Sequence, residues 1–220
     1  MNIYSIAGFT DPFSSIVHYI AAFIFMIIGL YLLLKKTGNK REFISVGILV
    51  ISTVAMLSLS ATYHLLDLGS TGRAVLQRLD HAAIFVLIAG TFTPIHSILF
   101  QGFLRWGILT IVWIMAICGI VFKSIFFNDM PEWLGLIFYL GMGWFGLLTG
   151  IVLARRFGIH FIKYFLFAAA AYTIGAIIEF LRFPVLIPGV LGPHEIFHIA
   201  VITGIACHWY FVVIVLRKVK

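Results

Sequence analysis

Apolar residues occur along the chain in seven blocks, separated by short polar segments. A helix of about 20 apolar residues is long enough to cross the hydrocarbon core of a bilayer. The pattern predicts membrane spans at residues 13–34, 43–66, 79–100, 106–127, 133–154, 164–181 and 194–216. We therefore expect an all-α integral membrane protein, a seven-transmembrane-helix bundle with short loops that forms a single domain over residues 1–220.

Composition supports a membrane protein and excludes a soluble globular one. Hydrophobic residues make up 62% of the chain and charged residues 10%, against about 25% charged residues in ordinary soluble domains. The two cysteines, Cys118 and Cys207, both lie inside apolar blocks. This placement excludes a disulfide framework and a cysteine-rich zinc motif. The formal charge of +7 resides in short loops rather than on a soluble face, so we expect membrane lipids and no nucleic acid as partners.

The basic residues are divided unequally between the two sides of the predicted bundle. The side of the N-terminus carries four of the 15 basic residues, namely Arg73, Arg78, Lys123 and Arg182, and the other side carries eleven. The positive-inside rule then predicts a cytoplasmic C-terminus and an N-terminus outside. We expect a multi-pass protein of the cell membrane, and the short termini favour a bacterial plasma membrane.

The last connection, residues 182–193, differs from the others in its composition. It holds three prolines and two glycines, which cannot continue a helix. The segment is typical of a lid or a re-entrant loop. Just before it, Glu179 at the end of the sixth span is expected to pair with Arg182, three residues further on.

Four polar residues at span ends are the candidates for chemistry. His194 and His198 begin the last span, and on a helix a spacing of four places both imidazoles on one face, as in a metal clamp. His64 ends the second span and Asp80 lies near the start of the third. The end of an even span and the start of an odd one lie in the same leaflet. All four side chains are therefore expected at one depth, where polar groups in a membrane are costly and usually functional.

These residue types match a catalytic zinc site. Three imidazoles and a water give four-coordinate zinc with one exchangeable position, and bound zinc activates that water and polarises carbonyls. Asp80 is predicted to orient the water and shuttle its proton. Ser60, one turn deeper than His64, is predicted to hydrogen-bond the water or a substrate carbonyl. The alternative is a network of hydrogen bonds between helices, with Ser60 as a small packing residue.

The other histidines are given lesser roles. His18 shares the leaflet of the predicted site, where a supporting or packing role is favoured over that of a fourth ligand. His81 is rotated by roughly 100° from Asp80 and is expected at the membrane interface. His96 and His160 lie in the opposite leaflet and cannot reach the site. His208 lies roughly 15 Å deeper than His198 and is expected to make a buried polar contact.

Several motifs resemble those of the hemolysin III family, within the wider progestin and adipoQ receptor superfamily. The matching elements, in order, are Ser60-x3-His64, the run from Leu79 to Pro94 that includes Asp80, Tyr172-Thr-Ile-Gly175, and His194-Glu-Ile-Phe-His198. The resemblance implies a seven-helix bundle with zinc held by His64, His194 and His198, and with Asp80 holding the metal-bound water. It also implies kinship with lipid-amide hydrolases, because adiponectin receptors and alkaline ceramidases share this ligand arrangement.

The first span departs from the family pattern. The family usually shows Glu, Asn and His in this region, and the corresponding residues here are Asp11, Ser14 and His18. Orientation differs as well, because adiponectin receptors are understood to keep their N-terminus and zinc inside the cell. The loop charges of this chain predict the reverse.

The sequence thus predicts an integral membrane zinc hydrolase that acts on an amide or ester bond of a lipid, as a ceramidase does. Two other classes stay open: a receptor-like sensor, or a pore-forming hemolysin, with a structural zinc. A pore should carry a polar stripe across the bilayer, whereas the polar residues here gather in one leaflet. A proton or metal transporter should carry acidic residues near the midplane, and none of the predicted spans does.

Overall fold

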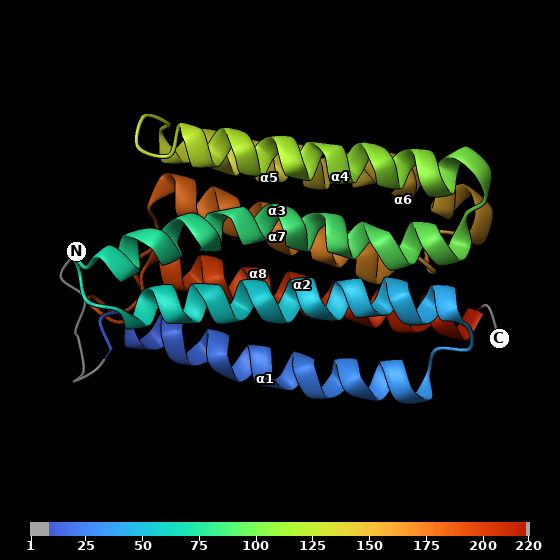
Figure 1. Ribbon diagram of the computed structural model, residues 1–220, viewed down its shortest axis with the longest axis horizontal. Coiled ribbons are helices and arrows are strands. Elements are labelled where there is room, and N and C mark those ends of the chain that lie inside the picture. The colour runs from blue at the N-terminus through green and yellow to red at the C-terminus, as the bar shows by residue number, and fades with distance from the viewer. Residues whose placement is uncertain (1–8, 219–220) are drawn as a thin grey trace.

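The computed structural model describes residues 9–218 as a bundle of long helices (Figure 1). The helices are α1 (Pro12–Lys35), α2 (Lys40–Leu65), α3 (Thr71–Leu99), α4 (Gly102–Ile125), α5 (Glu132–Trp144), α6 (Gly146–Phe157), α7 (Lys163–Leu181) and α8 (Pro193–Lys218). Because α5 and α6 form one continuous span, the described residues contain seven helical segments long and apolar enough to cross a membrane. The predicted seven-transmembrane-helix fold is confirmed, and the chain is a multi-pass membrane protein.

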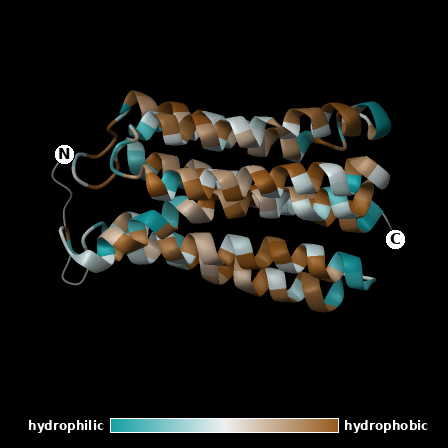
Figure 2. Ribbon diagram, turned by 45° about the horizontal axis from the view of Figure 1, so that its top comes forward, coloured by the Kyte–Doolittle hydropathy of each residue, from teal (hydrophilic) through white to brown (hydrophobic). Residues whose placement is uncertain are grey.

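The surface of the bundle suits a lipid environment. Hydrophobic colour covers the middle of the helices in Figure 2, and hydrophilic residues gather mostly near the helix ends. Large apolar side chains such as Phe23, Ile51 and Phe103 are more than half exposed. An apolar surface of this extent is stable in contact with lipid rather than with water.

The third helix begins earlier than the hydropathy pattern predicts. Residues 67–78 were expected to be a connection, but α3 starts at Thr71. The Ser70 hydroxyl accepts a hydrogen bond from the Arg73 amide at 3.2 Å and caps the helix. Hydropathy marks only the apolar part of this helix, and its first two turns are polar. Asp80 consequently lies in the third turn of α3 and not in the first.

Glycines allow close contacts between α2 and α3 and between α7 and α8. A Cβ atom placed on Gly90 of α3 would lie 2.1 Å from Ser52 Oγ of α2, so only glycine fits there. A Cβ atom on Gly175 of α7 would lie 2.7 Å from the Cβ of Ala200 in α8. Small residues at such contacts let membrane helices pack closely in the absence of a hydrophobic driving force.

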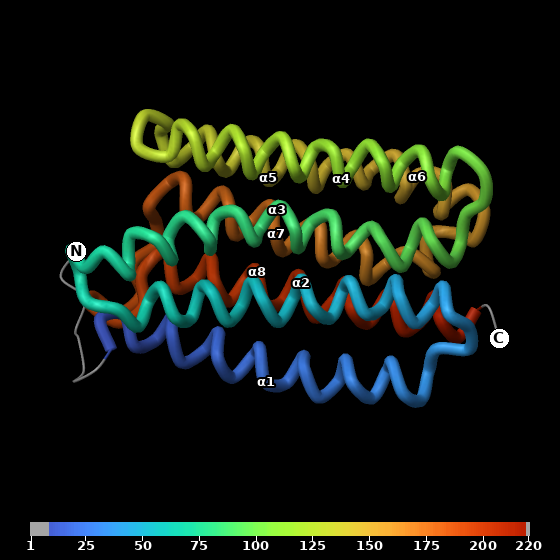
Figure 3. The backbone as a smooth tube through the Cα atoms, in the orientation of Figure 1, coloured from blue at the N-terminus to red at the C-terminus, as the bar shows by residue number. Residues whose placement is uncertain are grey.

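One end of the bundle collects the candidate residues. The start of α1, the end of α2, the start of α3 and the start of α8 lie together at this end, and α8 finishes at the other (Figure 3). The residues before α1 are tied to the end of α2, because the Asp11 amide donates to the His64 carbonyl at 3.0 Å. The connection 182–193 is irregular apart from a bridge between Ile187 and Leu191, and Phe183 and Leu186 within it are exposed.

Candidate metal centre

The three histidines predicted as ligands meet at this end of the bundle. His64 comes from the last turn of α2, and His194 and His198 come from the first turns of α8. One ring nitrogen from each lies within 4.8 Å of the corresponding atoms of the other two. His64 and His198 are buried, with 3% and 4% of their surface exposed, whereas His194 is partly exposed. Counting spans therefore places the three imidazoles correctly relative to one another.

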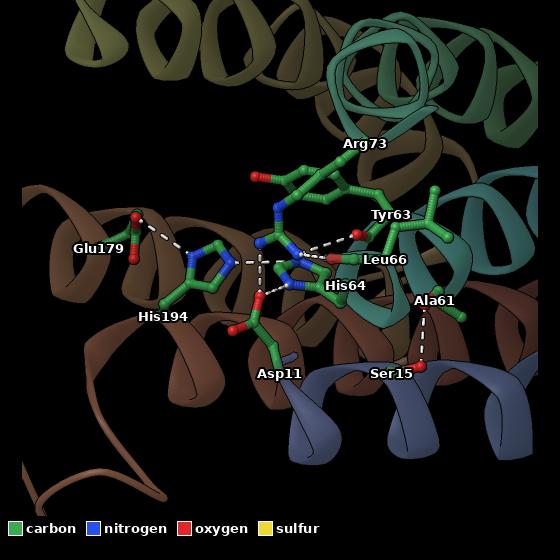
Figure 4. Close-up of polar contacts among 9 residues, drawn as sticks. All are labelled: Asp11, Ser15, Ala61, Tyr63, His64, Leu66, Arg73, Glu179 and His194. Carbon is green, nitrogen blue, oxygen red and sulfur yellow. Dashed lines mark hydrogen bonds and ion pairs between the residues drawn. The ribbon is translucent and has the colours of Figure 1, made fainter. Parts of the chain in front are cut away.

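A buried carboxylate positions the His64 ring (Figure 4). His64 Nδ1 donates to Asp11 Oδ2 at 2.9 Å, and Arg73 Nη2 donates to the same oxygen at 2.7 Å. Burial would raise the pKa of Asp11, but the His64 ring and the Arg73 guanidinium outweigh burial and hold this pKa below its ordinary value. Asp11 is therefore an ionised acceptor that fixes the proton on His64 Nδ1. Nε2 of His64 is left free to coordinate a metal.

A second carboxylate, that of Glu179, lies on the side of the His194 ring that faces away from the cluster. Glu179 Oε1 lies 3.4 Å from His194 Nδ1, as Figure 4 shows. The same oxygen accepts a hydrogen bond from Arg182 Nη1 at 2.6 Å, so the predicted pair of Glu179 and Arg182 is present. Arg182 also pairs with Glu132 at the start of α5. Two of the three imidazoles thus have an acidic group on the ring nitrogen that faces away from the cluster.

The arrangement of ring nitrogens fits a bound cation. With the Nδ1 atoms of His64 and His194 turned toward carboxylates, their Nε2 atoms face each other at 3.4 Å. Two facing lone pairs repel unless a proton or a metal ion lies between them. Nitrogens bound at 2.0–2.1 Å in a tetrahedral zinc site lie about 3.3–3.4 Å apart. The donor set and its spacing therefore suit a zinc-like dication.

Asp80 and Ser60 lie close to the histidine cluster without joining it. Both are buried, and both line the same cavity as His194 and His198. Asp80 is not among the groups whose ligand atoms converge within 4.8 Å. Its position suits a group that acts beside a metal rather than on it. His18 packs against His198 with ring centroids 4.3 Å apart and the ring planes tilted.

The cavity that begins at the histidines has a volume of about 930 Å³. It runs between α3, α5, α7 and α8, and α2 closes it near the cluster. Its apolar lining includes Leu87, Phe92, Leu136, Leu140, Phe165 and Val201. Small-molecule sites typically measure about 300–1,000 Å³, so this cavity has room for a long apolar chain whose head lies at the cluster.

Three other histidines occupy distinct positions. His96 lies at the opposite end of the bundle, where its ring bonds to the Leu104 carbonyl and the Thr149 hydroxyl. His208 is buried on the deep wall of the cavity. His81 was expected at the membrane interface; its ring lines the cavity and packs on Phe127, just past the end of α4.

Sequence reasoning missed two residues of the site. Asp11 was considered only as the counterpart of a family glutamate, and Arg73 only as a loop charge. The available signal was an acidic residue directly before the first apolar span, where an unpaired carboxylate is unfavourable. Its partners could not be derived, because they depend on how residues before α1 pack on the end of α2.

Comparison with known proteins shows the family to which the chain belongs. Residues 8–209 match the family described as Haemolysin-III related. The chain is 34% identical to Hemolysin-3 of Bacillus cereus over 137 residues, which covers 61% of this chain and 58% of that protein. It is 33% identical to the Hemolysin-3 homolog of Bacillus subtilis (strain 168) over 201 residues, 91% of this chain and 88% of that protein. The chain therefore belongs to the Haemolysin-III related family, within the progestin and adipoQ receptor superfamily.

Proposed function

We propose that the protein is an integral membrane zinc-dependent hydrolase that cleaves an amide or ester bond of a lipid. One observation carries the proposal: three converging imidazoles stand at the head of a large apolar cavity, and the buried carboxylate of Asp80 lines the same cavity. Imidazole donors suit zinc. Three protein ligands leave a fourth position for water or substrate, as in catalytic zinc sites.

Each residue has a defined task in this reaction. His64, His194 and His198 hold the metal, and Asp11 and Glu179 keep the Nδ1 protons of His64 and His194 directed away from it. A zinc ion bound there would polarise the substrate carbonyl and make water a better nucleophile at neutral pH.

Asp80 acts on the attacking water. It accepts the proton of this water as the new carbon–oxygen bond forms, and returns it to the leaving nitrogen or oxygen as the scissile bond breaks. Ser60 donates a hydrogen bond to the substrate carbonyl or to the water. A buried carboxylate is strongly unfavourable in its ionised form without a cation nearby, so a metal beside Asp80 would stabilise the charged form that this reaction requires.

The names of the relatives support a second candidate, a pore-forming cytolysin whose zinc is structural. The two functions separate in a haemolysis assay with purified protein. A hydrolase does not require lysis of red cells, whereas a cytolysin lyses them in proportion to the protein added. Lysis that persists in Asp80→Asn at the wild-type level would favour the cytolysin.

We also propose that the metal centre faces the outside of a bacterial plasma membrane, as the loop charges predict. A C-terminal reporter enzyme that functions only in the cytoplasm should be active. Activity only of a reporter that requires export would reverse this topology, and the centre would then face the cytoplasm.

Lipid analysis of intact cells tests the proposed reaction. Cells that express the wild type are expected to lose one class of amide- or ester-linked lipid and to accumulate its fatty acid. Cells that express His194→Ala at the same level should show neither change. Purified protein should then hydrolyse the depleted lipid or a ceramide. Identical lipid profiles in the two strains, with no turnover in vitro, would contradict a hydrolase.

A further inference from the structure

A buried lysine forms a second polar feature on the cavity wall. Lys123, in the last turn of α4, has 6% of its surface exposed and lines the same cavity as the histidine cluster. Within residues 9–218 its ammonium forms no ion pair. An ammonium removed from water is costly unless an anion compensates it. Glu132 acts on this ammonium only from beyond ion-pair distance, so no carboxylate of the described residues contacts it.

The surroundings of Lys123 are partly aromatic and partly cationic. Its Nζ lies 5.1 Å from the centre of the Phe127 ring, and the Arg78 guanidinium lies 4.9 Å from the same ring. The His81 ring packs on Phe127 as well, at 5.3 Å. A Cβ atom on Gly135 of α5 would be 3.4 Å from Nζ, so the lysine reaches across to α5 where that helix has no side chain. Cation–π contacts compensate only part of the cost of burying the charge.

Three acidic residues line the cavity. Glu132 and Glu179 are both paired with Arg182, and Asp80 belongs to the proposed catalytic centre. Next to Lys123, Nδ1 of His81 is buried and has no hydrogen-bond partner in the described part of the chain. Two neighbouring groups that can donate to an anion thus lack an acceptor, and both border a cavity that could hold one.

We propose that Lys123 and His81 bind the anionic group of an amphiphile whose apolar chain occupies the cavity. This anionic group is a carboxylate or a phosphate, because both accept charge-assisted hydrogen bonds from an ammonium. His81 directly follows Asp80 in α3, so this anion site adjoins the proposed catalytic centre. The inference rests on the proposed hydrolase, and it names the substrate class: a lipid with a negative charge close to the scissile bond.

Binding of brominated lipids to the full-length protein in detergent tests this proposal. Trp133 and Trp144 line the cavity, so bromine atoms on a bound chain should quench tryptophan fluorescence. The probes are brominated stearate, the brominated alkyl phosphate and the uncharged brominated alcohol of the same chain. The wild type should bind both anions at least about tenfold more tightly than the alcohol, as expected of a hydrogen bond to a charged group.

Variants identify the residue responsible. Lys123→Met should lose about tenfold in affinity for both anions and keep its affinity for the alcohol, whereas Lys123→Arg should retain most of the preference. Lys163→Met, at the opposite end of the bundle, is the matched control and should behave as the wild type. Equal binding of stearate and alcohol by the wild type, or an equal loss of both in Lys123→Met, would overturn the proposal. Displacement of stearate by millimolar inorganic phosphate would also overturn it, because the ligand would then be a free anion.

The same assay separates this inference from the proposed function. If purified protein hydrolyses no lipid but Lys123→Met still loses anion binding, the hydrolase is wrong and the anion site stands. If the wild type hydrolyses lipids with neutral and anionic head groups at equal rates, and Lys123→Met does the same, the hydrolase stands and the anion site is wrong.

Discussion

Buried histidines occur at both ends of the bundle, but their ring nitrogens are satisfied in different ways. At one end, Nδ1 of His96 bonds to the Leu104 carbonyl at 2.6 Å and Nε2 to the Thr149 hydroxyl at 2.9 Å. At the other end, the Nδ1 atoms of His64 and His194 face carboxylates, while their Nε2 atoms face each other.

This difference is the basis on which we separate a structural imidazole from a proposed metal ligand. A buried ring with a protein partner on each nitrogen needs no further group, and it joins helices in the way that polar residues commonly do within membranes. Facing nitrogens with acidic groups behind them are satisfied by a proton or by a metal ion between them, and the proposed zinc fills this role. Burial alone does not distinguish the two ends, because His96 and His64 are almost equally buried. The hydrogen-bond partner of each ring nitrogen distinguishes the two ends.

The largest expected effect is a loss of turnover when Asp80, the carboxylate beside the proposed ligands, is replaced. Asp80→Asn should retain zinc but lose turnover of the lipid substrate by about 10²–10⁴-fold, the usual contribution of a general acid–base group. Asp67→Asn, an exposed substitution in the connection between α2 and α3, is the control and should leave turnover unchanged. Full turnover in Asp80→Asn would remove this carboxylate from the reaction.

A smaller effect, on zinc affinity, is expected when Asp11, the carboxylate bonded to His64 Nδ1, is replaced. Asp11→Asn should weaken zinc binding by about 10–100-fold, the usual cost of losing a carboxylate that supports a metal-bound histidine. Thr149→Val is the corresponding change at the other end, because it removes a partner of His96. Competition with a zinc chelator measures both variants. Equal zinc affinities in the two would show that Asp11 does not support the metal.

The smallest effect, on stability, is expected at the end of the bundle that holds His96. Thr149→Val leaves a buried nitrogen of His96 without its partner, which should lower the free energy of unfolding by about 1–3 kcal/mol. Thermal unfolding in detergent measures the loss, and zinc content serves as the internal control. A fall in zinc content in this variant would mean that the two ends are not independent.

Span counting from the sequence brought the three histidines together correctly because it needs only the order and length of the helices. His64 ends an even span and His194 begins an odd one, so they had to share a leaflet. The same reasoning placed His96 at the other end, as observed. It did not reveal that His81 lines the cavity, because a count of spans gives the depth of a residue but not the direction of its side chain.

Other parts of the site depend on contacts that no local pattern encodes. The bond between Asp11 and His64 spans 53 residues and requires the residues before α1 to lie along the end of α2. Lys123 was counted as a loop charge, although it lies buried in the cavity wall. Hydropathy cannot tell a residue that faces lipid or solvent from one that faces an internal cavity. The cavity itself emerges only when helices pack.

The most direct test of the central claim is the zinc content of purified protein, measured by mass spectrometry of the metal. We expect about one zinc ion per chain in the wild type and in Thr149→Val, the number expected for one tetrahedral site. We expect a strong reduction in His194→Ala and in His198→Ala. Wild-type zinc levels in both alanine variants would contradict a metal centre built from these histidines.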